Sequence, residues 1–170
     1  MVTFGMNDSG YFEYNGDKPK EFGEQKYQES IKNYQQMEKR FKDLPDTRIV
    51  MVGTSPYDET VQLKENTPFK TKNETIKRLV EYQKESAAKN NWEFTDLNAP
   101  MTAINQQYQQ KDPTFTLCGS DRIHPDNDGH MVMAYLFLKA QGFVGKEVAD
   151  MEINANKKQA VKSENCTVSN

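Results

Sequence analysis

A carboxylate and an imidazole stand close together in the segment 118–125. The chain has only two histidines, His124 and His130, and Asp121 precedes the first of them by three residues. In a short loop, the carboxylate can accept a hydrogen bond from one ring nitrogen, which fixes the tautomer and leaves the other nitrogen free as a base. The spacing therefore predicts a general-base histidine, although a capped turn with an ordinary surface histidine would have the same pattern.

The residues after His124 also bear on this loop. Pro125 keeps His124 out of α geometry, and Asp126 and Asp128 are suited to cap a helix that starts nearby. His124, Asp126, Asp128 and His130 alternate, and such side chains can bind divalent ions. The spacing does not fit a calcium loop, however, and capping accounts better for the two aspartates. We therefore expect neither a metal site nor a cofactor.

Composition sets broad limits on the chain. Its 170 residues suit a single domain, and a net charge of −3 gives no general attraction to nucleic acid. Hydrophobic residues make up 35% and the mean hydropathy is −0.92, and no stretch reaches the ~18 apolar residues of a membrane span. Two cysteines are too few for a disulfide framework. No leader segment is visible at the N-terminus, so localisation stays open, and secretion or a periplasmic location would need a leader upstream of Met1.

Hydrophobic patterning predicts alternating strands and helices. Strands are expected at 1–5, 48–53 and 92–97, and helices at 24–42, 73–89, from Asn98 onward, and at 128–141. The last helix is apolar nearly all round, which predicts burial. Thr71 and Glu74 form a possible capping box, and Asn98 a possible cap. The order predicts a parallel sheet with right-handed crossovers and helices on both faces.

Polar loops follow the predicted strands. Asn7 and Asp8 come directly after the first strand, the segment 53–59 follows the second, and the Asp121–His124 loop lies beyond the third. In open α/β sheets, ligands bind at the carboxyl ends of the strands, so we expect these loops to share one functional rim. Ordinary turn chemistry is the alternative interpretation of Asn7 and Asp8.

Two of these loops resemble sequence blocks of the SGNH hydrolases, also called GDSL-type esterases and lipases. Gly5-Met6-Asn7-Asp8 resembles their third block, Gly-x-Asn-Asp, and Asp121-Arg122-Ile123-His124-Pro125 resembles the fifth, Asp-x-x-His-Pro. The resemblance covers residues 1–142. It implies a three-layer α/β/α, flavodoxin-like fold with strand order 2-1-3-4-5, and ester hydrolysis through an acyl-serine without metal or cofactor. It further implies His124 as the base, Asp121 as its orienting acid and Asn7 as the oxyanion-hole donor.

The chain departs from the family pattern at the nucleophile. The Gly-Asp-Ser block and the block with the oxyanion-hole glycine have no counterpart upstream of Asn7. Ser9, Ser55 and Ser120 lack a nucleophile-elbow context. We therefore expect residues 1–145 to form a partial hydrolase domain that lacks its first strands, is inactive alone, and leaves an open sheet edge able to associate with another chain. Residues 146–170 are expected to form a C-terminal tail that contains a weak hairpin.

The substrate and the alternatives remain open at this level. Polar and aromatic rim loops favour small esters or acylated carbohydrates. A non-catalytic carbohydrate- or acyl-binding module on the same fold is the main alternative, with aromatic side chains able to stack on a sugar: Tyr11, Tyr14, Tyr57 and Trp92. A nucleotide-binding domain is disfavoured because the glycine-rich phosphate motifs are absent.

Overall fold

The computed structural model describes residues 1–169 and has a parallel sheet at its centre. The strands are β1 (Val2–Phe4), β2 (Val50–Gly53) and β3 (Glu93–Asp96), in the order β1-β2-β3. Met51 of β2 pairs with Val2 on one side and with Phe94 on the other. The parallel α/β fold predicted from the sequence is confirmed, and the carboxyl ends of all three strands meet at one rim.

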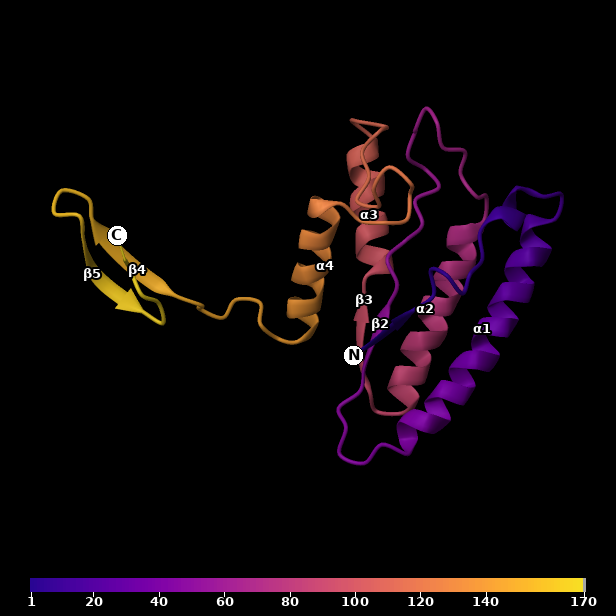
Figure 1. Ribbon diagram of the computed structural model, residues 1–170, viewed down its shortest axis with the longest axis horizontal. Helices are drawn as coiled ribbons and strands as arrows, with labels where there is room; N and C mark the ends of the chain where they lie inside the picture. The colour runs from indigo at the N-terminus through magenta and orange to yellow at the C-terminus, as the bar shows by residue number, and fades with distance from the viewer. Residues whose placement is uncertain (170) are drawn as a thin grey trace.

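Helices cover both faces of this sheet (Figure 1). The short 3-10 helix η1 (Phe12–Asn15) is followed by α1 (Pro19–Lys42) and α2 (Lys72–Lys89), which lie side by side on one face. On the other face lie α3 (Asn98–Gln109) and α4 (Asn127–Ala140). The result is the three-layer arrangement that the strand and helix order predicts.

The central strand β2 joins the two halves of the core. Val50 and Val52 pack into a cluster with α3 and the segment before α4, whereas Met51 packs into a cluster with α1 and α2. All four residues of β2 are buried. Burial on both faces explains why this strand is apolar without alternation.

Helix α1 begins earlier than predicted. Pro19 occupies its first turn, where a missing N–H costs nothing, so residues 19–23, before the predicted start at 24, are already helical. Gly23 then faces α2, because a Cβ atom there would lie 2.5 Å from the hydroxyl of Thr75. The glycine therefore lets the two helices approach closely.

The start of α2 is capped from a distance. The expected capping box of Thr71 and Glu74 does not form, because Thr71 has a φ of 68° and makes no side-chain cap. Instead the Glu59 carboxylate accepts the backbone N–H groups of Thr71 and Asn73, at 2.9 and 2.6 Å. A negative charge at a helix N-terminus is favourable.

The two later caps also differ from expectation. Asn98 is the first residue of α3 rather than its cap, and Asp96 Oδ1 accepts the Ala99 N–H at 3.1 Å. Asp126 occupies the cap position of α4 with an extended backbone, but its side chain makes no cap hydrogen bond. The start of α3 is therefore capped by Asp96 in place of Asn98.

The expectation that α4 is buried is wrong. Met131, Tyr135 and Leu138 are 71%, 53% and 48% exposed, and Gly129 is the only buried residue of the helix. One side of α4 packs on the core, through Val132, Met133, Leu136 and Phe137. A helix that contacts the sheet on one side buries only one stripe, and nothing within residues 1–169 covers the other.

The last described elements form an antiparallel hairpin of β4 (Asp150–Asn154) and β5 (Gln159–Glu164). It stands apart from the helices and the parallel sheet (Figure 1). Whether residues 1–145 and 146–170 behave as separate units stays a prediction. Across the described chain, none of the helices combines the length and apolar character that crossing a bilayer requires.

Candidate active site

The structure joins Asp121 and His124 in one loop. Nδ1 of His124 lies 2.5 Å from Oδ2 of Asp121. The other carboxylate oxygen accepts the backbone N–H groups of Ile123 and His124, each at 2.9 Å. The His124 side chain is 81% exposed, and its ring has no further hydrogen bond within residues 1–169. Nε2 therefore faces solvent and is free to take a proton.

Electrostatics keep the Asp121 carboxyl charged. Burial alone would raise its pKa, but hydrogen bonds from the His124 ring and from the backbone of His124 and Ile123 outweigh this, so the pKa is lowered. An ionised carboxylate on Nδ1 stabilises the imidazolium that forms when Nε2 accepts a proton. The pair has the arrangement that a general base needs.

Two residues in the left-handed backbone conformation give the loop its shape. Gly119 and Arg122 have φ values of 70° and 69°, and the Arg122 N–H donates to the Gly119 carbonyl at 3.1 Å. A Cβ atom at Gly119 would lie 2.2 Å from the carbonyl oxygen of His124. Glycine is therefore required at position 119 for the chain to turn back on itself.

Arg122 anchors the loop to the rest of the rim. It is 2% exposed, and its guanidinium donates to the carbonyl oxygens of Asp58 at 3.0 Å, Val61 at 2.7 Å and Asn66 at 2.6 Å. The acceptors are backbone atoms, so no complementary acid in the sequence marks this role. Sequence reasoning missed Arg122.

Asn7 lies in the loop at the carboxyl end of β1. Gly5 has a φ of 137° and approaches Thr54, where an added Cβ would be 2.9 Å from a methyl carbon. The Gly5 N–H donates to Asp8 Oδ2 at 2.9 Å, so Asp8 supports the turn. The Asn7 side chain is exposed, and its Oδ1 accepts a hydrogen bond from the Tyr11 hydroxyl.

The Asn7 loop and the Asp121–His124 loop share one end of the sheet. Met6 and Ile123, each adjacent to a predicted site residue, pack against the same buried cluster, which consists of Tyr57, Ile76 and Val80. Burial, followed by the negative charges of Asp121 and Asp8, raises the pKa of Tyr11. Tyr11 is thus close enough to both loops to interact with each.

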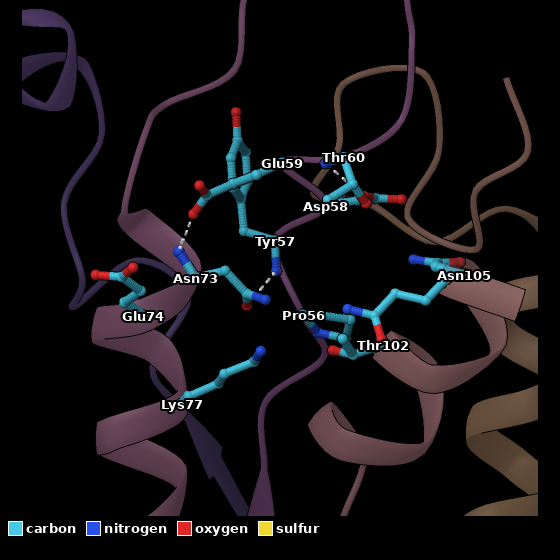
Figure 2. A pocket seen from close by; sticks show the side chains of 11 residues that line it. Pro56, Tyr57, Asp58, Glu59, Thr60, Asn73, Glu74, Lys77, Thr102 and Asn105 are labelled. Atoms are coloured by element: carbon cyan, nitrogen blue, oxygen red, sulfur yellow. Dashed lines mark hydrogen bonds between the residues drawn. The ribbon is translucent and has the colours of Figure 1, made fainter. Parts of the chain in front are cut away.

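A half-open pocket in this region is separate from the predicted site residues. About 150 Å³ in volume, it lies between the segment 56–60, the start of α2 and α3 (Figure 2). Its wall includes Asn73, whose Oδ1 accepts the Tyr57 N–H at 3.2 Å, and the capping residue Glu59. Neither Asn7 nor His124 lines it. A second hollow of about 240 Å³, bounded by residues 3–8 and Thr54, lies directly beside Asn7.

The three serines considered from the sequence occupy different environments. Ser9 is fully buried, and its Oγ donates to the Met6 carbonyl at 2.8 Å and accepts from Lys72. Ser55 is 8% exposed, whereas Ser120 is exposed on the loop itself. In the described part of the chain, no serine hydroxyl is hydrogen-bonded to the His124 ring.

The prediction that four aromatic side chains could stack on a sugar is wrong for three of them. Tyr14 and Tyr57 are 2% and 0% exposed, so their faces are packed in the core. Trp92 precedes β3 at the opposite end of the sheet and packs against Phe41, with ring centroids 5.8 Å apart. Of these four rings, only that of Tyr11 remains available at the rim, because the other three are packed against neighbouring side chains.

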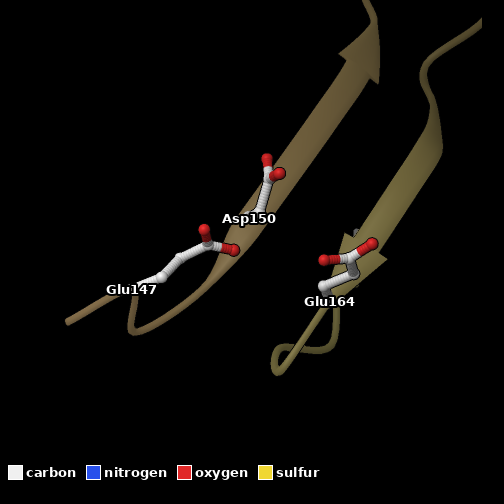
Figure 3. Close-up of side chains that lie close together, drawn as sticks. All are labelled: Glu147, Asp150 and Glu164. Atoms are coloured by element: carbon white, nitrogen blue, oxygen red, sulfur yellow. The ribbon is translucent and has the colours of Figure 1, made fainter.

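Among residues 1–169, three acidic side chains come close together at the base of the hairpin. Carboxylate oxygens of Glu147, Asp150 and Glu164 lie within 4.8 Å of one another (Figure 3). The Lys162 ammonium contacts Asp150 and lies 3.5 Å from Glu164. Its single positive charge offsets one of the three negative charges, so the group is partly neutralised by local charge pairing.

Comparison with known proteins assigns the family. Residues 1–132 match the model of the GDSL-like Lipase/Acylhydrolase family, so the chain belongs to this family. The resemblance to SGNH hydrolases inferred from the two sequence blocks is confirmed. The comparison with curated proteins finds no significant match.

Several solved structures are similar to this chain. BT4096, described as a gut microbial diltiazem-metabolizing enzyme, is 83% identical, with a TM-score of 0.86 over 100% of this chain and 38% of that chain. A catalytic mutant of Axe2, an acetylxylan esterase from Geobacillus stearothermophilus, is 20% identical with a TM-score of 0.59, over 84% of this chain and 58% of that one. Another Axe2 mutant, from the same organism, is 21% identical and has a TM-score of 0.60. The match covers 86% of this chain and 60% of that chain. The chain thus spans less than two thirds of these proteins, and the Axe2 likeness supports the fold alone.

Proposed function

We propose that this chain carries the general base and an oxyanion donor of an ester hydrolase that cleaves short acyl esters through an acyl-serine. The observation that carries the proposal is the Asp121–His124 pair, with 2.5 Å between Oδ2 and Nδ1 and with Nε2 left free. The Asn7 amide at the same rim is the second element. Family membership supports this choice over a non-catalytic binding module.

The reaction follows from the proton positions. Nε2 of His124 takes the proton of a serine hydroxyl as its oxygen attacks the ester carbonyl, and Asp121 stabilises the imidazolium. The imidazolium then gives this proton to the departing alkoxide, which leaves an acyl-serine. Water, deprotonated by the same Nε2, hydrolyses the acyl-serine, and the proton returns to the serine. Asn7 donates to the tetrahedral oxyanion, a contribution typically worth ~10²–10³ in rate.

The nucleophile is proposed to come from sequence outside these 170 residues. The Ser9 hydroxyl is already engaged by Met6 and Lys72. Within residues 1–169 no strand pairs with the outer edge of β1, and Phe4 at its carboxyl end is 51% exposed. A further parallel strand added at this edge would end next to the hollow beside Asn7. That position suits a serine that must approach both Asn7 and His124.

The substrate class is inferred from the relatives. BT4096 is described by its metabolism of diltiazem, and Axe2 by its action on acetylxylan. Acetylxylan is, by its name, an acetyl ester of a carbohydrate. We infer that this chain serves the hydrolysis of acetyl and other short acyl esters on small molecules or carbohydrates.

A hybrid enzyme tests the proposal, with residues 1–170 replacing the matching segment of BT4096. Hydrolysis of a short p-nitrophenyl ester is measured for the hybrid and for the 170-residue chain alone. We expect the hybrid to be active, with His124→Ala reducing kcat at least ~10³-fold. His130→Ala is the matched control, because this exposed histidine of α4 lies outside the proposed site.

Two outcomes would contradict the proposal. Hydrolysis by the hybrid that survives His124→Ala would exclude the imidazole as the base. Turnover by the 170-residue chain alone, lost in His124→Ala, would place the nucleophile within these residues.

A further inference from the structure

A buried lysine lies against the Asn7 loop. Lys72, the first residue of α2, is 0% exposed, and its Nζ donates to the Met6 carbonyl at 3.0 Å, to Ser9 Oγ at 2.7 Å and to the Gly10 carbonyl. An ammonium group has three N–H donors, and here each meets one acceptor. Since the acceptors lie on both sides of Asn7 in the sequence, Lys72 holds the loop at both ends.

The same ammonium holds the ring of Tyr11. Nζ of Lys72 lies 3.9 Å from the Tyr11 ring centroid, a close cation–π contact. The ring also meets Phe69 edge-on, with centroids 6.2 Å apart. These two contacts fix the direction in which the Tyr11 hydroxyl points.

That hydroxyl engages only one end of the Asn7 amide. The Tyr11 O–H donates to Asn7 Oδ1, whereas Nδ2 of Asn7 makes no hydrogen bond within residues 1–169. If the side-chain amide of an asparagine rotates by a half-turn, its carbonyl oxygen and its NH₂ group exchange places, so an acceptor replaces a donor. With Oδ1 held by Tyr11, the two N–H groups are left for the oxygen of a bound molecule.

We propose that Tyr11 and Lys72 are positioning residues that set the Asn7 amide with its N–H groups toward the substrate. The inference rests on the proposed role of Asn7 as an oxyanion donor. Neither residue is required to touch the substrate, because Tyr11 acts through Asn7 and Lys72 acts through Tyr11 and the loop. Burial and the nearby Asp121 and Asp8 charges raise the Tyr11 pKa, so its phenol stays protonated and remains a donor.

Kinetics of the hybrid enzyme test this coupling. Tyr11→Phe removes one hydrogen bond, so we expect kcat to fall about tenfold with KM changed less than about twofold. Asn7→Ala should lower kcat ~10²–10³-fold. The double variant should be no slower than Asn7→Ala, because Tyr11 has nothing left to orient. Tyr135→Phe, on the exposed side of α4, is the matched control and should leave kcat unchanged. Independent, multiplying effects of Tyr11→Phe and Asn7→Ala would overturn the inference.

NMR of the 170-residue chain tests, without any need for catalysis, whether Tyr11 and Lys72 hold the Asn7 side-chain amide in place. The Asn7 side-chain NH₂ should be as rigid as the backbone on the nanosecond timescale, and Tyr11→Phe and Lys72→Met should both make it mobile. The exposed Asn156 side chain is the internal reference. An Asn7 amide that is already mobile in the wild-type chain, or unaffected by Tyr11→Phe, would overturn the inference. This readout is independent of turnover. Failure of Tyr11 and Lys72 to position Asn7 is therefore distinguishable from failure of the proposed esterase function.

Discussion

Nη1 of Arg122 lies 2.7 Å from the backbone carbonyl oxygen of Val61. This contact crosses from the loop that carries the Asp121–His124 pair to the loop that follows β2. Arg122 is flanked by the residues that form the pair, yet its own side chain points into the protein. The geometry of the proposed general base therefore depends on a buried cation whose acceptors are all carbonyl groups.

Arg122→Met should destabilise the protein by about 3 kcal/mol, since it leaves buried carbonyl groups of Asp58, Val61 and Asn66 without a donor. Urea unfolding measures the loss. Arg48→Met is the control, because Arg48 is 65% exposed and its pairing with Glu93 is a solvent-screened surface ion pair that contributes little to stability. Equal effects of the two substitutions would mean that the Arg122 contacts contribute little.

Gly119→Ala should disrupt the loop, whereas the same change at Gly145 should leave it intact. Gly119 and Gly145 have φ values of 70° and 77°, so alanine is strained by ~1 kcal/mol at either site. Only at Gly119 does the new Cβ meet an atom, the His124 carbonyl oxygen at 2.2 Å, whereas nothing lies within 4 Å at Gly145. We expect Gly119→Ala alone to remove the downfield NMR signal of the His124 Nδ1 proton. Retention of that signal would show that the loop adjusts to the methyl group.

Lys72 should make stability depend on pH. Burial lowers its pKa to about 7, whereas lysine in the unfolded chain titrates near ~10.4. Above pH 7 the folded protein has released a proton that the unfolded chain still binds. The free energy of unfolding therefore rises with pH, by up to ~1.4 kcal/mol per unit for this group.

The difference between the wild-type protein and Lys72→Met isolates this effect. We expect the wild type to gain on the order of 2 kcal/mol over the variant between pH 7 and pH 9, measured by urea unfolding. Lys84→Met, at an exposed lysine of α2, should show the wild-type pH dependence. Parallel curves for the wild type and Lys72→Met would contradict a lowered pKa.

Asp121→Asn should abolish most activity of the hybrid enzyme while leaving the fold intact. Replacing the carboxylate removes the charge that stabilises the imidazolium, and we expect kcat to fall about 10³–10⁴-fold. Asp126→Asn is the control, since Asp126 makes no cap hydrogen bond through its side chain. A loss below about tenfold for Asp121→Asn would show that the imidazole acts without its neighbouring acid.

Local chemistry explains which predictions from the sequence were correct. Asp121 and His124 are three residues apart, so a single loop can bring them together whatever surrounds it. The apolar run of β2 and the helical spacing of α1 and α2 likewise follow from short-range periodicity. Asn7 was placed at the rim by the rule that ligands bind at the carboxyl ends of parallel strands.

The sequence by itself thus determined the order of the elements, the family and the acid–imidazole pair. Tertiary structure decided the burial of Lys72 and Arg122, the use of Glu59 as a distant cap and the half-exposed state of α4. The partners of Lys72, Arg122 and Glu59 are 12 or more residues away, and α4 is apolar on a face that the described residues leave uncovered. Periodicity and motif spacing report on neighbours in the chain, whereas burial and long-range hydrogen bonds depend on which segments meet in space.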